Sequence, residues 1–415
     1  MFNEKWTGVS DMNGTKQYFA QKSVWAGLLA VVAIVALLGW AFVGSTVNPV
    51  PKRIPVALVA ADKGADVPGK GRMNIGDVLK QKLTTEMTPT GEKSPFEWTV
   101  LDDEQAAAEG LDRQTFYAVV VLPETLSADF VALLSPQPKP AEVRVLVNQG
   151  KSGVAATMVT QAVGKMLEGA NAALREQALG QLQQMKGDAV SIAQAKALAA
   201  PLAVTFQTVH PILPNTANGN APVVLTQLAW ISALAATVLL FVAAGKAGAG
   251  ASGGWGIAAS QLIAGLAYAV VASAAILAVV GGLFGLDVPD VTETGLFLTL
   301  AVYSFFLLQS AIVNWIGLKG MPVLVLLFFF GLPILNLPPE FLPDAARDWL
   351  YSWIPFRFSA EGLRDLFYFR QGLNVGGPAS VLGWIAAAGA VVLLASGAKR
   401  TKRAPEPSAS VDAVR

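Results

Sequence analysis

The sequence predicts an α-helical polytopic membrane protein with six transmembrane helices and an α/β extracytoplasmic domain between helices 1 and 2. Three observations support this fold class. Of 415 residues, 53% are hydrophobic and only 14% are charged, against about 25% charged in an average soluble protein. The apolar residues gather in six runs, and most charged residues lie between the first two runs. This distribution excludes a disordered chain, a fibre and an ordinary cytosolic enzyme.

The six apolar runs are judged by the length that a bilayer requires. A hydrocarbon core of about 30 Å needs about 20 consecutive apolar residues in a helix. The predicted spans are 24–44, 223–244, 257–285, 296–318, 321–337 and 379–398. The fifth is the shortest and contains Pro322 and Pro333. The first is too long for a signal peptide and lacks a small-residue cleavage site, so we expect a retained anchor.

The orientation follows from the basic residues of the short segments. With the N-terminal segment 1–23 in the cytoplasm, the inside segments hold ten basic and four acidic residues, and the later outside loops hold four basic and eight acidic residues. Lys and Arg favour the cytoplasmic side. We therefore expect a multi-pass plasma membrane protein with both termini, including the basic tail 399–415, in the cytoplasm.

Residues 45–222 have the composition of a water-soluble domain. The expected strands are 54–60, 96–101, 116–122, 142–147 and 202–209, and the expected helices are 75–86, 102–109 and 123–134. Strands that alternate with helices predict an α/β layer. Pro123 suits a first helical turn, and Asp102 to Glu104 suit a helix start. The Ala- and Gln-rich stretch 154–200 predicts one long helix or a hairpin that turns near Gly187.

Few residues support enzyme chemistry. The chain has no Cys and one His, His210, so no catalytic residue, metal site or cofactor is predicted. The net charge of +1 gives no reason to expect nucleic acid as a partner. Gly150-Lys151-Ser152 resembles the end of a phosphate-binding loop, but Val145 stands where the pattern requires Gly. We interpret it as a turn between a strand and a helix.

The fourth span carries an unusual number of polar residues. Tyr303, Ser310 and Asn314 share one helical face, and Gln309 lies beside them. Polar side chains inside a membrane tend to mark pathways, so these four are candidates for a substrate path. The alternative is that they form hydrogen bonds that hold the bundle or a dimer together.

The outside segment 338–378 is too polar to span a membrane and unusually aromatic. Its aromatic residues are interleaved with arginines, which is typical of a helix at the headgroup level. Ser359 could cap this helix. Trp353, Arg357, Glu361 and Arg364 are the candidate residues of an outer interfacial gate.

Several strings resemble the YhgE/Pip (phage infection protein) group of ABC-2 type membrane proteins. They are Ile54 to Gly64, Glu97 to Asp103, Phe116 to Glu124, Asn215 to Trp230 and Ile354 to Arg364. The layout of one anchor, an outward α/β domain and five further spans is also that of the group. Two features differ: the helical insert 154–200 is short, and residues 245–256 contain six glycines.

The resemblance implies an ABC-2 type permease in the domain 223–398, and an exporter is our first hypothesis. An apolar or amphipathic substrate suits a path with no buried charge. The resemblance also implies a homodimer or pseudo-symmetric pair and a separate ATP-binding subunit, since this chain has no nucleotide-binding domain. Membrane lipid is the remaining expected partner. The alternative function is a cell-envelope scaffold or phage receptor whose outward domain binds partners.

Overall fold

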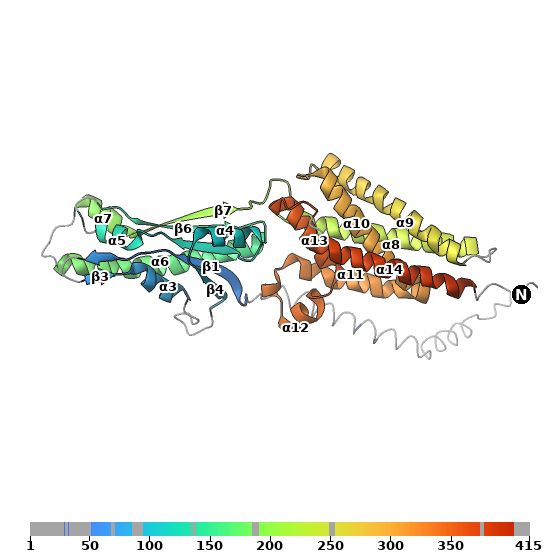
Figure 1. The fold of residues 1–415 in the computed structure, drawn as a ribbon, viewed down its shortest axis with the longest axis horizontal. Helices are drawn as coiled ribbons and strands as arrows, with labels where there is room; N and C mark the ends of the chain where they lie inside the picture. The colour runs from blue at the N-terminus through green and yellow to red at the C-terminus, as the bar shows by residue number, and fades with distance from the viewer. Residues whose placement is uncertain are drawn as a thin grey trace, which may run out of the picture.

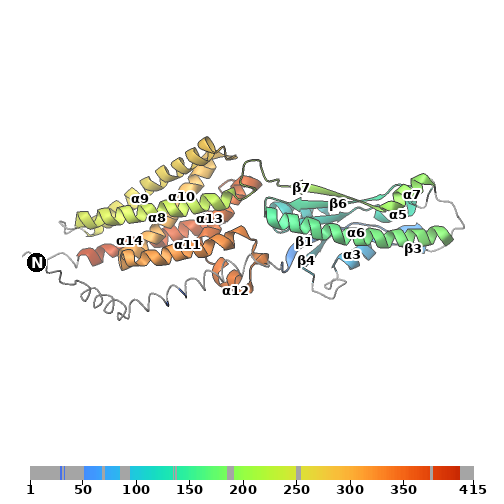
Figure 2. The ribbon, with the colours of Figure 1, turned by 180° about the vertical axis from the view of Figure 1, so that it is seen from behind.

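The computed structural model has an α/β domain at one end and a helical bundle at the other (Figures 1 and 2). It describes Leu29, Val32 and residues 51–67, 71–84, 94–133, 135, 138–184, 191–248, 254–373 and 377–401. The predicted anchor 24–44 lies outside these residues, apart from Leu29 and Val32, which are helical.

The α/β domain is built on a five-stranded sheet in the order β4-β1-β5-β6-β7. Its strands are β1 (Ile54–Ala60), β4 (Phe96–Leu101), β5 (Ala118–Leu122), β6 (Ala141–Asn148) and β7 (Leu202–Val209). Strand β1 pairs in parallel with β4 and β5, β5 is antiparallel to β6, and β6 is parallel to β7. Every residue of β5 is buried, as expected for a Val-rich central strand covered on both faces. Strands β2 (Ala65–Val67) and β3 (Gly71–Met73) form a separate ribbon.

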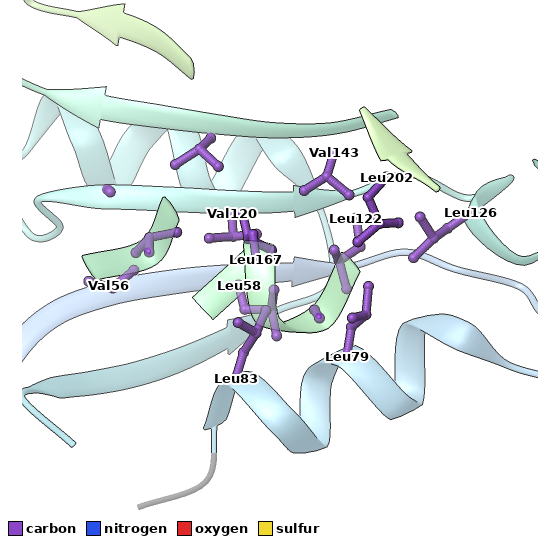
Figure 3. Close-up of a cluster of buried hydrophobic side chains, with 14 of the residues drawn as sticks. Val56, Leu58, Leu79, Leu83, Val120, Leu122, Leu126, Val143, Leu167 and Leu202 are labelled. Carbon is purple, nitrogen blue, oxygen red and sulfur yellow. The ribbon is translucent and has the colours of Figure 1, made fainter. Parts of the chain in front are cut away.

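Helices cover both faces of the sheet. The larger core cluster joins the sheet to α3 (Ile75–Thr84), α5 (Leu126–Ala132), α6 (Gly153–Gln184) and α7 (Ile192–Ala199). Figure 3 shows Leu79, Leu83 and Leu167 beside Leu58 and Val120. On the opposite face, α4 (Glu104–Asp112) supplies a smaller cluster. The domain therefore has three layers.

Asp62 links the loop after β1 to the starts of two helices. Its carboxylate accepts hydrogen bonds from the backbone N–H of Gly76 at 2.8 Å and of Ser127 at 2.9 Å, and from the Ser127 hydroxyl. The first N–H groups of a helix have no partner within it, so an anion stabilises them. Asp62 thus fixes α3 and α5 at one end of the sheet.

Two local expectations for this domain have different outcomes. Asp103 is the N-cap of α4 and accepts a hydrogen bond from Ala106 N at 2.7 Å, which confirms the predicted helix start. Pro123 does not lie in a first helical turn, because α5 begins at Leu126 with Thr125 at its N-cap. The prediction missed that the Pro-Glu-Thr sequence forms a turn before the helix. The turn expected near Gly187 lies outside the described residues.

The bundle contains five helices long and apolar enough to cross a membrane within the described part of the chain. They are α8 (Ala221–Gly248), α9 (Gly254–Leu277), α10 (Val291–Ile316), α11 (Met321–Asn336) and α14 (Pro378–Thr401). A π-helical segment, Ala278–Leu283, extends α9. Helix α10 starts earlier than the predicted 296 because Asp290 caps it by accepting from Glu293 N at 2.8 Å.

Helix α10 is the centre of the bundle. In its most apolar window 67% of the residues are buried, against 28–39% for the other four helices. Glycines allow neighbouring helices to approach it closely: a Cβ added to Gly389 of α14 would lie 2.8 Å from the backbone carbon of Leu307, and one added to Gly265 of α9 would lie 1.9 Å from the Phe306 ring. Close backbone approach at small residues is a general means of helix association in membranes.

The segment between α11 and α14 folds into short helices at the bundle end that faces the α/β domain (Figure 1). These include α12 (Asp344–Ala346) and α13 (Pro355–Arg364). Ser359 does not cap a helix: Ile354 is the N-cap of α13, and the buried Ser359 hydroxyl lies 2.9 Å from Thr226 Oγ1 in α8. Phe356 is buried against Trp230, whereas Trp349 and Trp353 remain exposed.

Candidate functional site at the domain junction

A cavity of about 570 Å³ lies between the α/β domain and the end of the bundle. From the α/β domain it is lined by Arg113, Gln114, Tyr117 and residues 149–154. The bundle side contributes residues 335–340, Tyr351, Arg357, Ala360, Glu361, Arg364, Asp365, Gln371 and Pro378, and residues 218–220 before α8 complete it. The volume is within the range of small-molecule sites, about 300–1,000 Å³.

The turn between β6 and α6 places Lys151 at this cavity. Asn148 holds the turn: its amide donates to Leu111 O at 2.8 Å, and its oxygen accepts from Lys151 N at 3.3 Å. Gly150 is required for close contact, since an added Cβ would lie 2.7 Å from Tyr368 Cβ. The Lys151 Nζ donates to Thr115 O at 3.2 Å and lies 3.8 Å from the centroid of the Tyr117 ring. The Gly-Lys-Ser sequence is thus a strand-to-helix turn.

The bundle side is arranged around α13. The Arg357 Nε donates to Glu361 Oε1 at 2.8 Å, and the Tyr351 hydroxyl donates to the same oxygen at 3.0 Å. The Arg357 guanidinium also lies 4.8 Å from the centroid of the Tyr351 ring. Glu361 and Arg364 are one helical turn apart, so they share a face of α13 that lines the cavity.

Hydrogen bonds join the two parts of the molecule around the cavity. The Tyr117 hydroxyl donates to Glu340 Oε2 at 2.8 Å, and the Gln114 amide donates to Asp365. His210 lies between the parts, with Nε2 2.9 Å from Asp112 Oδ1 and Nδ1 3.2 Å from Tyr368 O. These contacts couple the position of the α/β domain to that of α13.

Burial perturbs the titration of several groups at the junction. Burial, assisted by the nearby Arg364 and opposed by Glu340, lowers the pKa of the Lys151 ammonium to about 8. Burial raises the pKa of Asp365 to about 6. Burial and the Glu340 carboxylate raise the pKa of Tyr117 well above its usual value. Burial disfavours the charged form of each group. The cavity is therefore partly dehydrated, and the charges of Lys151 and Asp365 change at a pH closer to neutrality than usual.

The four candidate gate residues do not all meet. Arg357, Glu361 and Arg364 line the junction cavity, whereas Trp353 is not among the lining residues and is 55% exposed. The sequence reasoning did not associate Tyr117, Lys151 or Glu340 with these residues. Nothing in the local sequence signals that association, because Tyr117 and Glu340 are 223 positions apart.

The four candidate path residues lie inside the bundle and form hydrogen bonds to neighbouring groups. The Tyr303 hydroxyl donates to Leu262 O of α9 at 3.2 Å. Gln309 contacts Thr237 Oγ1 and Trp230 O of α8, each at 3.4 Å. Ser310 Oγ lies 3.3 Å from Thr237 Oγ1, and the Asn314 amide donates to Ser310 O at 2.8 Å. The contacts with α8 and α9 hold helices together, whereas the Asn314 bond lies within α10. A substrate path through these residues stays a prediction.

Metal ligands are sparse among these residues. In the part of the chain that the structure describes, no three His, Asp or Glu side chains are grouped so that they could hold a metal ion.

Five apolar helices that carry an α/β domain define a polytopic membrane protein with a large domain outside the membrane. The sequence model of the family described as "ABC-2 family transporter protein" matches residues 22–398. The chain therefore belongs to the ABC-2 transporter family.

Two individual proteins are similar to parts of the chain. "Uncharacterized protein YhgE" of Bacillus subtilis (strain 168) is 25% identical over 164 residues, which are 39% of this chain and 20% of that protein. The match thus spans about a fifth of that protein's length. A crystallised domain of a putative ABC type-2 transporter from Thermotoga maritima MSB8 is 16% identical, with a TM-score of 0.26, over 37% of this chain and 84% of that domain.

Proposed function

We propose that the chain is the membrane-spanning permease of an exporter that moves an apolar or amphipathic substrate outward across the plasma membrane. A separate subunit hydrolyses ATP, and the permease acts as a homodimer. The observation that carries this proposal is the family match over residues 22–398, which includes the α/β domain as well as the bundle.

The charge distribution in the bundle supports an apolar or amphipathic substrate. Charged residues of the five described spans lie near helix ends, namely Lys246, Glu293, Lys319 and Lys399. Among the described residues of these five spans, the buried polar side chains are neutral, such as Gln309 and Ser310. An ionic molecule crossing there would have no counter-charge, and an unpaired charge inside a membrane is costly. A mainly apolar molecule, or the apolar part of an amphiphile, has no such requirement.

The junction supports a role for the α/β domain in the transport cycle. Helix α13 packs against α8, α10 and α14 and also lines the cavity below the α/β domain. A movement of these spans would change the positions of Arg364 and Glu361 relative to Lys151. We propose that this rearrangement opens and closes the outer end of the permease.

Copurification of an ATPase tests the proposal most directly. The full chain, tagged and expressed in its native host, should retain an ATP-binding protein in mild detergent. Lys246, in the last turn of α8, and Lys319, in the short turn between α10 and α11, are exposed. Helix α8 ends at the side of the bundle opposite the α/β domain (Figure 1). Reversal of both charges (Lys246→Glu with Lys319→Glu) should release the ATPase. The same reversal at two exposed cations of α6, Lys165→Glu with Arg175→Glu, should retain it. Absence of any ATPase from the wild-type preparation contradicts the proposal.

The orientation has its own test. The chain has no cysteine, so each introduced cysteine can be labelled alone. Ala128→Cys, at an exposed position of α5, reports the side of the membrane on which the α/β domain lies, and Ser408→Cys reports the side of the C-terminal tail. An impermeant maleimide should label position 128, and not position 408, on intact cells. The reverse pattern contradicts outward placement of the α/β domain.

A further inference from the structure

The junction cavity is lined by two cations, Lys151 and Arg364, that form no salt bridge with a carboxylate among the described residues. We propose that it binds the anionic head group, a phosphate or carboxylate, of an amphipathic molecule through Lys151 and Arg364. The inference deepens the proposed function by naming the charge and position of the head group of the exported molecule.

The other charged groups that line the cavity already have partners. Arg357 is paired with Glu361 at 2.8 Å, and Arg113 lies 3.3 Å from Glu109. Of the two remaining carboxylates, Glu340 accepts from Tyr117, and Asp365 accepts from Gln114. Neither of these two carboxylates forms a salt bridge with Lys151 or Arg364 among the described residues, so these two cations remain available to a ligand.

Arg364 and Lys151 approach the cavity from opposite parts of the molecule. Arg364 ends α13, and its guanidinium has no hydrogen-bond acceptor among the residues that the structure describes. Among the described residues, the Lys151 Nζ donates to one backbone oxygen, that of Thr115, and contacts the Tyr117 ring. Burial lowers the pKa of Lys151, the Glu340 carboxylate raises it, and the nearby Arg364 lowers it to a smaller extent, so Arg364 repels Lys151 although Glu340 attracts it. An anion between them would relieve this repulsion and accept charge-assisted hydrogen bonds from both.

The location fits an amphiphile better than a small soluble anion. The end of α11, residues 335–336, and the start of α14, Pro378, line the cavity. These are the ends of two predicted spans, the level at which lipid head groups lie. Asn218 and Asn220 also line the cavity, where the Asn220 amide donates to Asn336 Oδ1 at 3.4 Å. A head group in the cavity could therefore keep its apolar chains beside α11 and α14.

Lipid binding by the purified full chain tests this inference without transport. The protein in a neutral detergent is titrated with short-chain phosphatidylglycerol, and bound lipid is counted by native mass spectrometry. Phosphatidylcholine, which has no net negative charge, and inorganic phosphate, which has no acyl chains, are tested in the same way. Phosphatidylglycerol should bind in a one-to-one ratio. The variant Lys151→Gln with Arg364→Gln should weaken that binding at least about tenfold, since both charge-assisted hydrogen bonds are lost.

Matched variants separate the site from general charge effects and from misfolding. The control Lys165→Gln with Arg175→Gln removes two positive charges from exposed positions on α6 and should leave binding unchanged. Arg364→Lys keeps the charge and should retain most of the binding. The inference is overturned if the junction and control variants bind phosphatidylglycerol equally, or if phosphatidylcholine binds as well as phosphatidylglycerol to the wild type.

The remaining arm identifies the source of the anion. Competition by millimolar inorganic phosphate, with no gain from the acyl chains, would overturn the amphiphile and leave a free-anion site. Lipid binding without a copurifying ATPase would support this site and contradict the proposed exporter. A copurifying ATPase without selective lipid binding would support the proposed exporter and contradict this site.

Discussion

The polar side chains in the interior of the bundle differ from those at the domain junction in charge and in hydrogen-bond partners. Around α10 the polar side chains are neutral, and Gln309 and Ser310 are bonded to α8. At the junction seven of the side chains that line the cavity are charged, and Arg364 has no acceptor among the described residues. A bilayer offers no water to satisfy a polar group, so polar groups there must find protein partners. The difference is that Gln309 and Ser310 of the bundle bond to a neighbouring helix, whereas Arg364 at the junction keeps donors without an acceptor among the described residues.

Helix packing should be the most sensitive property of the bundle. Gly389→Ala would place a methyl group 2.8 Å from the Leu307 backbone, which cannot move independently of α10. We expect a loss of about 1–3 kcal/mol in the unfolding free energy, measured by titration with SDS. Gly383→Ala in the same helix meets no atom within 4 Å and should be neutral or slightly stabilising. Equal effects of the two substitutions would contradict close α10–α14 contact.

Polar contacts in the bundle should matter less than its close packing. Gln309→Leu with Asn314→Leu removes hydrogen bonds of α10, including the contact to Thr237. Each such bond stabilises a bundle by about 0.6 kcal/mol on average, with a maximum near 1.7, so we expect a modest fall in the midpoint of SDS unfolding. An export assay on the same variant decides the second role. Full export would contradict a polar substrate path through α10.

The hydrogen bond between the two parts of the molecule should have an effect on stability of similar, modest size. Tyr117→Phe keeps the ring beneath Lys151 but removes the bond to Glu340. We expect a loss of about 0.5–1.5 kcal/mol and a wider distance distribution between spin labels on α5 and α13. Tyr268→Phe, at an exposed ring of α9, is the matched control and should change neither quantity. An unchanged distance distribution in Tyr117→Phe would mean that this bond does not hold the junction.

Anion binding at the junction should weaken as the pH rises from 7 to 9. The pKa of Lys151 is about 8, so its positive charge is largely present at pH 7 and largely lost at pH 9. Phosphatidylglycerol should therefore bind about threefold to tenfold more weakly at pH 9, the effect of losing one charged contact. The facing groups are Arg364, Glu340 and Asp365; the last titrates near pH 6, below this window.

The variant Lys151→Gln is the control for that pH dependence. It should bind weakly and equally at pH 7 and pH 9. A similar decline in this variant would assign the titration to another group.

The fold was largely predictable because its signals are local. All five strands of the main sheet and the second to sixth spans were expected near their observed positions. A run such as Ala118–Leu122 or Val223 to Ala244 specifies its own environment through its apolar side chains. The errors concern boundaries, such as the starts of α5, α10 and α13, where short turns and capping residues decide.

The site was predictable only in part, for a physical reason. Arg357, Glu361 and Arg364 could be found because they recur on one short helix among aromatic residues. Tyr117 and Lys151 line the same cavity as these three residues. Tyr117 directly precedes β5 and Lys151 lies in a turn, and at such positions these residue types usually serve packing. Only the tertiary fold brings these two groups together.

The wide separation of Tyr117 and Glu340 along the chain also constrains biosynthesis. The strands of the α/β domain leave the ribosome before α11 to α14 are made. At that stage Lys151 lacks Glu340 and Arg364, the groups that line the same cavity in the folded chain. The junction cavity is thus completed last, and a chain that lacks α11 to α14 also lacks the residues that line its bundle side.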